Sequence, residues 1–395
     1  MAEALKRRIG PGLLMAYGVG VIVGAGIYVL VGAVAGAAGV WAPLSFLLAG
    51  LIAAPTALSY AELSVRYPEA AGEAAYVEGG LGSRWLAVVV GLGIVLAGTI
   101  SAAAVLRGGV GYLTGVVAID PTWAIAGIGA ALVAVSIVGV LESLALAALF
   151  TLVELAGLGL VVWAASGAEP VAGYLAAPQI HWAGVGAGAV LAFFAFIGFE
   201  DIVNMAEEVR DPGRTLPLAI LGALGIATLI YGLVSWSAVR ALPADVLTGS
   251  EQPLALVWQQ TRGGDARVLS MIAVVAALNG VLAQIVMAAR VLFGMRTRWA
   301  LLAPLGHVSA RFGTPVAATL LVGAAVIATA TALPVATLAE STSAVLLAVF
   351  VLVNAALIGL KRRGPSPGFS VPMIVPVAGL GIAAVTFGLT LKGLT

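Results

Sequence analysis

The chain has 395 residues, of which 62% are hydrophobic and only 9% are charged, and its formal net charge is +1. Soluble domains are about 45–50% apolar and about 25% charged, so this composition excludes a soluble fold and indicates many membrane crossings. The small net charge argues against nucleic-acid binding. The absence of cysteine excludes disulfides, thiolate metal sites and a cysteine nucleophile. Both histidines fall in predicted loops, so we expect neither a metal site nor a cofactor.

Eleven apolar stretches approach or exceed the length of about 20 residues that a membrane-spanning helix needs. They cover residues 12–36, 42–65, 84–112, 122–140, 143–165, 184–207, 215–239, 267–290, 314–332, 334–360 and 371–391. Most lysine and arginine residues then fall in loops on the N-terminal side, which places the N-terminus in the cytoplasm. The arginine-, alanine- and glycine-rich composition hints at a bacterial source. We therefore expect an all-α, polytopic protein of the bacterial inner membrane.

Two glycine-containing stretches interrupt these spans, at residues 23–28 in the first and 194–200 in the sixth. Broken helix at membrane depth is tolerated only where it faces protein or a water-filled cavity. The spans divide into five, five and one, and an odd number per unit forces the second unit to be inverted. We expect residues 1–395 to form one transmembrane domain with repeats at 12–165 and 184–360 and an extra helix at 371–391. In such repeats a transporter site lies at the interface between the units.

The first interruption has the chemistry to hold a zwitterion. Gly24 and Gly26 tolerate backbone angles that other residues avoid. Unwinding there frees amides at a helix N-terminus, which attracts a carboxylate, while freed carbonyls can accept hydrogen bonds from an ammonium group. An α-amino acid carries both groups. The alternative, that these glycines only let helices pack closely, stays open at this point.

Several motifs in order resemble the amino acid–polyamine–organocation superfamily of transporters, which has the leucine-transporter-type fold. The matching stretches are residues 18–28, 59–68, 206–212 and 338–343. The resemblance covers about residues 10–365 and implies alternating access, with the substrate held between the first and sixth helices. It implies substrate contacts from Ile22, Gly24, Ala25, Gly26, Phe194, Ile197 and Gly198.

Other site candidates follow from this resemblance. Phe194 stands where some relatives carry a tryptophan that stacks on cationic side chains, so phenylalanine favours a neutral amino acid. Thr99 lies in the middle of the third span and can either reach the substrate or bond its own helix. Glu200 follows the second interruption directly and is a candidate for gating or proton response. Glu340 is a candidate outer gate, or else a carboxylate that stabilises a helix start.

Glu154 gives the sharpest prediction. It lies about twelve residues from the nearest charged residue, or roughly 18 Å along a helix, close to the middle of the bilayer. Carboxylates at that depth are costly and usually functional. Proton-coupled relatives often carry a lysine at the corresponding position, from which this chain departs. Asn279 aligns with a position that supplies sodium ligands in sodium-coupled relatives. A protonated Glu154 can bond Asn279, either as a proton carrier or as a permanently neutral structural group.

These patterns predict a secondary active transporter that couples to protons and takes up neutral amino acids across the lipid bilayer. The alternatives are an exchanger of cationic amino acids or polyamines, and a sensor that binds amino acids without transporting them. A membrane-embedded enzyme is not expected, because no serine–histidine, metal-ligand or aspartyl pair falls at membrane depth. The sequence leaves the oligomeric state open.

Overall fold

The computed structural model describes residues 9–24, 26–68, 72–138, 144–176, 179–295, 299, 302, 304–305, 307–309, 311–365 and 368–393. Within these residues the secondary structure is helical, apart from one isolated parallel bridge between Ile9 and Val209. Two backbone hydrogen bonds form this bridge, from Ile9 N to Glu208 O (3.1 Å) and from Arg210 N to Ile9 O (2.9 Å). The bridge joins the segment before the first helix to the segment before α10.

The helices follow one another as the apolar stretches predict. Their bounds are α1 (Pro11–Val23), α2 (Gly26–Ala38), η1 (Gly39–Trp41), α3 (Ala42–Arg66), α4 (Gly72–Leu81), α5 (Arg84–Thr114), α6 (Pro121–Val138), α7 (Leu144–Ser166), α8 (Ala172–Leu175), α9 (Trp182–Phe193), η2 (Phe194–Phe196), η3 (Glu200–Glu208), α10 (Pro212–Ala241), α11 (Ala244–Thr248), α12 (Pro253–Arg262), α13 (Arg267–Gly294), α14 (Val316–Ala332), α15 (Val335–Arg363) and α16 (Ile374–Gly393).

Nine helical stretches among the described residues are long and apolar enough to cross a membrane, and two shorter apolar helices accompany them. The chain is therefore a polytopic membrane protein. The difference from the eleven predicted spans has two causes. The first predicted span is divided after Val23, so α1 has only 13 residues, and α2, η1 and α3 continue as one helical stretch. The other short helix, α14, has 17 residues, about 25 Å of rise.

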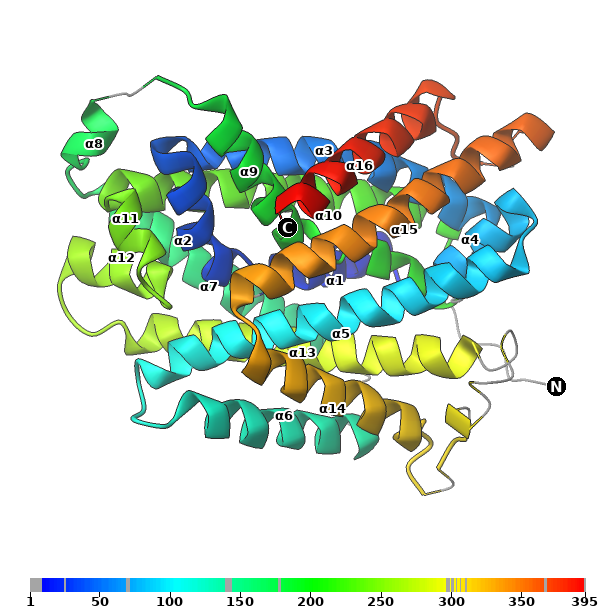
Figure 1. Ribbon diagram of the computed structural model, residues 1–395, viewed down its shortest axis with the longest axis horizontal. Helices are drawn as coiled ribbons and strands as arrows, with labels where there is room; N and C mark the ends of the chain where they lie inside the picture. The colour runs from blue at the N-terminus through cyan, green and yellow to red at the C-terminus, as the bar shows by residue number, and fades with distance from the viewer. Residues whose placement is uncertain are drawn as a thin grey trace.

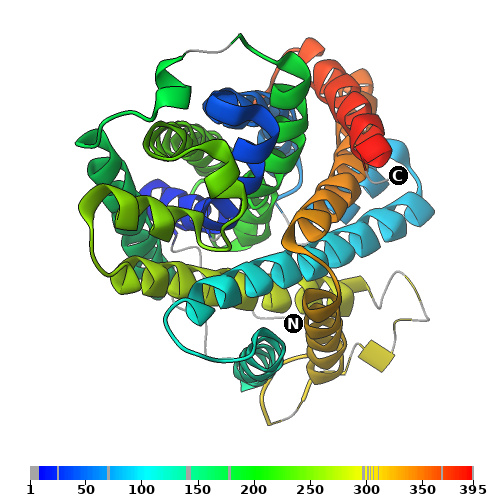
Figure 2. The same ribbon diagram turned by 60° about the vertical axis from the view of Figure 1, so that its left-hand side comes forward.

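The interrupted helices lie inside the bundle. In Figures 1 and 2, α5 and α13 run side by side across the molecule, and α6 and α14 pack together along one edge. On the other side α15 and α16 pack against each other and against α3. α1, α2, α9 and α10 pack together between these layers. Both interruptions are therefore surrounded by protein.

A buried carboxylate fastens α16 to this bundle. Glu62, fully buried near the end of α3, accepts hydrogen bonds from Arg66 Nη2 (2.7 Å) and Nε (3.0 Å) through Oε1. Its Oε2 pairs with Lys361 Nζ of α15 at 2.7 Å and accepts from the backbone N–H of Val371 at 2.8 Å. Val371 leads into α16. One carboxylate thus joins α3, α15 and the segment that leads into α16.

A second polar group joins the same helices deeper in the bundle. The side chain of Asn354 in α15 accepts from Ser59 Oγ (2.7 Å) and donates to Thr56 Oγ1 (3.0 Å), both in α3. Gly379 of α16 crosses directly over this amide, and a Cβ at that position would overlap Asn354 Oδ1. Glycine is therefore required at 379 for α16 to reach the polar group.

Removing the charge of Glu62 is expected to destabilise the fold. Glu62→Gln keeps the shape but leaves the nearly buried Lys361 ammonium without its carboxylate, which costs about 3–5 kcal/mol of unfolding free energy. The measurement is the melting temperature of the purified protein in detergent. Asp265→Asn is the matched control, because its pair with Arg267 is 60% and 71% exposed and such pairs contribute about 0–1 kcal/mol. Equal shifts for the two variants would contradict the prediction.

Candidate functional site

The first interruption separates α1 from α2. Gly24 has φ 21° and ψ −155°, and its N–H still bonds to Gly20 O at 3.1 Å. Ala25, a predicted substrate contact, lies outside the described residues. The last carbonyls of α1 and the first amides of α2 lack the partners that a continuous helix would supply.

The second interruption separates α9 and η2 from η3. Ile197 is extended (φ −61°, ψ 133°), and Gly198 has φ 124°, a conformation that favours glycine. The carboxylate of Glu200 turns back on this break, because its Oε2 accepts the N–H of Gly198 at 2.9 Å. Glu200 therefore satisfies a backbone donor that the interruption frees. The sequence places a carboxylate here but does not predict this bond.

The two interruptions touch each other. A Cβ on Gly26 would lie 3.1 Å from Ala195 Cα, and a Cβ on Gly198 would lie 2.8 Å from Val21 Cγ1 and 3.0 Å from Val21 O. Glycine thus serves two purposes at the interruptions, an unusual backbone angle and close packing of the two helices. Gly24 provides an unusual backbone angle, Gly26 allows close approach, and Gly198 does both. Gly26 thus lies against Ala195, the residue after Phe194, and Gly198 lies against Val21, the residue before Ile22. That these residues form one substrate site stays a prediction.

The apolar side chains at the interruptions are almost enclosed. Phe194 and Ile197 are 4% and 9% exposed, and Ile22 is buried. Tyr60, Phe199 and Phe350 form a buried aromatic cluster, with ring centroids 5.3 to 5.7 Å apart. Phe199 directly follows Gly198 of the second interruption. Thr99 is also buried, and its hydroxyl donates to Val95 O of its own helix at 2.7 Å. This is the bond expected if the hydroxyl has a structural role and does not contact the substrate.

Glu154 lies beside the first interruption. It is fully buried in α7, and neither carboxylate oxygen has a hydrogen-bond partner among the described residues. Asn279 of α13 is the neighbouring polar side chain, but the predicted bond to it does not form with normal geometry. A carboxyl group buried without partners is stable as the neutral acid. Tyr28 of α2 donates to the backbone carbonyl of Glu154 at 2.9 Å, which ties α7 to the second half of the interrupted helix.

A group of buried carboxylates lies on the η3 side of the site. Glu73 of α4, Glu200 and Asp201 are all buried, and none of them forms an ion pair with a described residue. Asp201 Oδ2 accepts from Gln284 Nε2 of α13 at 3.0 Å. Burial, together with the nearby charge of Asp201, raises the pKa of Glu73 to about 7. The sequence analysis did not identify Glu73. It lies in a short helix between two spans, where no periodic pattern of apolar residues indicates that the helix is buried.

Glu340 lies one turn inside α15. The helix begins at Val335 and has no acidic residue in its first turn, so stabilisation of a helix start does not explain Glu340. Its side chain is half-buried. The gating role stays a prediction.

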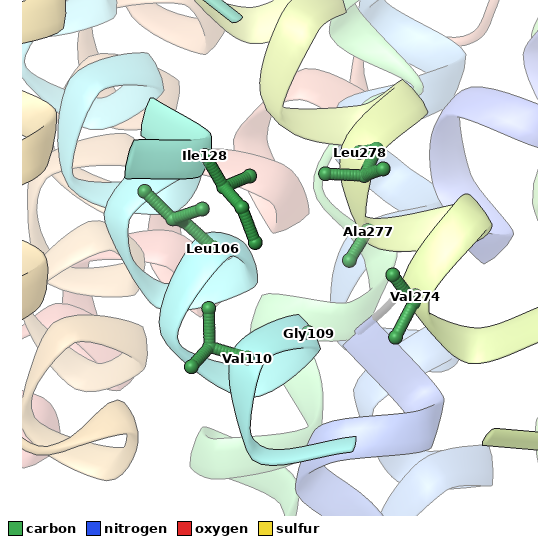
Figure 3. Close-up of a pocket in the computed structure, with 7 residues that line it drawn as sticks. All are labelled: Leu106, Gly109, Val110, Ile128, Val274, Ala277 and Leu278. Carbon is green, nitrogen blue, oxygen red and sulfur yellow. The ribbon is translucent and has the colours of Figure 1, made fainter. Parts of the chain in front are cut away.

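Two hollows in the molecule lie away from the interruptions. The first is a cavity of about 10 Å³ between α5, α6 and α13, and Figure 3 shows its apolar side chains. It is lined by Leu106, Gly109, Val110, Ile128, Val274, Ala277 and Leu278. A water molecule needs polar partners, so this cavity is a packing gap. The second is a groove of about 450 Å³ that includes Val153 and Arg267. Neither is lined by a residue of the interruptions.

Gly198→Ala is expected to damage the site. The added Cβ meets the backbone of Val21 in a conformation that favours glycine, and such strain costs about 1–3 kcal/mol. We expect a lower melting temperature and weaker substrate binding. Gly225→Ala in α10 is the matched control, because a Cβ there meets nothing within 4 Å. Equal loss of binding in both variants would count against a special role for Gly198.

Comparisons with known proteins identify the family of the chain. The model of a family described as amino acid permease matches residues 13–392. An uncharacterized transporter of Mycobacterium tuberculosis is 32% identical over 99% of this chain and 88% of its own length. The branched-chain amino acid permease BcaP of Bacillus subtilis is 27% identical over 98% of this chain and 88% of that protein. The vacuolar cationic amino acid transporter 4 of Arabidopsis thaliana is 31% identical over 82% of this chain and 58% of that protein. The chain therefore belongs to the amino acid permease family of the amino acid–polyamine–organocation superfamily, a family of transporters and not of enzymes.

Proposed function

We propose that this permease is a secondary active transporter that moves a neutral amino acid by alternating access, with the substrate bound where the two interruptions meet. One observation carries the proposal: Gly26 and Gly198 bring two broken helices into backbone contact inside the bundle. Backbone donors and acceptors that helices would otherwise use are freed at this contact. The similarity to a branched-chain amino acid permease supports the substrate class.

The proposed architecture is a pair of inverted repeats. Residues 12–165 and 184–360 each begin with an interrupted helix, and α16 lies outside both units. Each unit would contribute one interruption, so the site would lie at their interface. The bias of lysine and arginine residues supports a cytoplasmic N-terminus in the bacterial inner membrane.

We propose separate contacts for the carboxylate, the ammonium group and the side chain of the substrate. Its carboxylate faces the first amides of α2, because the positive end of a helix stabilises an anion by about 0.3–2 kcal/mol. Its ammonium group donates to carbonyls at the two breaks, including that of Ile22. Its side chain packs against Phe194 and Ile197.

Proton coupling is proposed for Glu154. This residue is buried next to the first interruption, and its carboxylate has no hydrogen-bond partner among the described residues. No described group therefore holds it permanently in the ionised form. A group that gains and loses a proton there would alter the packing of α7 on both halves of the interrupted helix. The competing role is a permanently neutral carboxyl that only fills space.

A cationic substrate is the second candidate. Glu154 and Glu200 are buried carboxylates, and neither forms an ion pair within the part of the chain that the structure describes. A positively charged side chain could pair with one of them. The similarity to a cationic amino acid transporter supports this alternative.

The transport proposal is tested by uptake of labelled amino acids into proteoliposomes under an inward proton gradient without sodium. We expect gradient-dependent accumulation of neutral amino acids, with a protonophore abolishing it. Accumulation of lysine or arginine instead would select the cationic candidate. Uptake only against preloaded substrate would indicate an exchanger. Binding without flux in either format would overturn transport and indicate a sensor.

Glu154→Gln tests the coupling separately. The amide cannot carry a proton, so gradient-driven accumulation is expected to fall about 5- to 150-fold, the usual range of a coupling free energy. Exchange between preloaded and external substrate should persist. Glu169→Gln is the control, because Glu169 lies exposed just beyond the same helix. Unchanged gradient-driven accumulation in Glu154→Gln would rule Glu154 out as the proton carrier.

A further inference from the structure

A single hydroxyl group touches the free carbonyls of both interruptions. Tyr231 lies in the middle of α10 and is fully buried. Its Oη lies 2.7 Å from Ile22 O at the end of α1 and 2.7 Å from Ala195 O in η2. Val23 O lies 3.3 Å away. The three carbonyls come from two helices that are far apart in the sequence.

One hydroxyl cannot satisfy three acceptors. A tyrosine O–H has one hydrogen, and each carbonyl oxygen has two lone pairs. Tyr231 therefore donates to Ile22 O and Ala195 O in turn or shares its hydrogen between them, and lone pairs on both remain available. Because both oxygens lie 2.7 Å from the same atom, they cannot be separated by more than twice that distance. An ammonium group with three N–H donors can bridge acceptors at that spacing.

The ring of Tyr231 is held firmly in place. Phe196 packs edge-on against it, with centroids 5.0 Å apart, and Phe46 of α3 packs from another direction at 5.8 Å. Ser235, one turn further along α10, donates to the backbone carbonyl of Tyr231 at 2.6 Å. The ring cannot swing away without disturbing both aromatic neighbours. The hydroxyl therefore acts as a fixed point between the two interruptions.

We propose that Tyr231 is a positioning residue that holds the carbonyls of Ile22 and Ala195 together as one acceptor site for the amino group of the substrate. This inference rests on the proposed binding of an amino acid at the interruptions. It adds a residue from α10, outside both broken helices, that determines how strongly the amino group is recognised. Without the hydroxyl, the two carbonyls lose the donor that they share.

The test compares an amino acid with the analogue that lacks its α-amino group. Dissociation constants for the leucine and 4-methylpentanoate pair are measured by competition on purified protein. For Tyr231→Phe, which removes only the hydroxyl, we expect leucine binding to weaken about tenfold or more, since buried carbonyls lose a donor. Binding of 4-methylpentanoate should change little, so the ratio of the two constants falls. A general structural defect would weaken both ligands alike.

Ser237→Ala is the matched control, because its buried hydroxyl bonds to the backbone of α10 at Leu233 and not to Tyr231. Its ratio should equal that of the unmodified protein. If Tyr231→Phe keeps the full ratio, the positioning role is overturned while binding at the interruptions stands. If the unmodified protein binds other permease substrates but does not distinguish an amino acid from its deaminated analogue for any tested pair, the proposed site itself fails.

A second measurement applies if Tyr231→Phe does not fold. Replacing Tyr231 alone by 3-fluorotyrosine preserves the shape of the ring and makes the hydroxyl a stronger donor. The ratio of the two dissociation constants must then shift if the hydroxyl positions the carbonyls. An unchanged ratio overturns the proposal.

Discussion

The arrangement around the two interruptions follows from one constraint, which is that a backbone amide or carbonyl cannot be left unpaired in a membrane. Two helices are interrupted inside an apolar bundle, and side chains bond to backbone amides and carbonyls at the interruptions. Glu200 accepts the N–H of Gly198, and Tyr231 serves carbonyls of both breaks. In the proposed site, the backbone groups that keep a free lone pair or hydrogen are the ones that bind the substrate.

The same constraint separates two kinds of buried carboxylate. Glu62 has two cations and a backbone amide around it and joins α3, α15 and the start of α16. Glu154 has no described partner and lies beside a broken helix. Removing a compensated charge weakens the fold, whereas changing the protonation of an uncompensated group alters packing next to the site. The number of partners therefore distinguishes a structural carboxylate from a candidate for coupling.

Sequence reasoning found what depends on local composition and missed what depends on contacts between distant helices. The apolar stretches and the glycines predict the helices and their two interruptions, because membrane length and backbone freedom are local properties. The role of Tyr231 was not predicted, because its hydroxyl meets Ile22 across 209 positions of sequence. A lone tyrosine in the middle of an apolar span was the available signal. The expected bond between Glu154 and Asn279 also depends on side-chain geometry: the two side chains are neighbours, but their atoms do not reach normal hydrogen-bond geometry.

The bridge between Ile9 and Val209 has a mechanical consequence. It links the chain just before α1 to the chain just after η3, so the ends of both interrupted helices on that side form one joined body. Pulling one of them outward alone requires breaking two backbone hydrogen bonds, each with a net value of about 0.5–1.5 kcal/mol. A hinge motion that carries both segments together leaves the bonds intact. Moving the two segments together therefore avoids the cost of breaking these two hydrogen bonds.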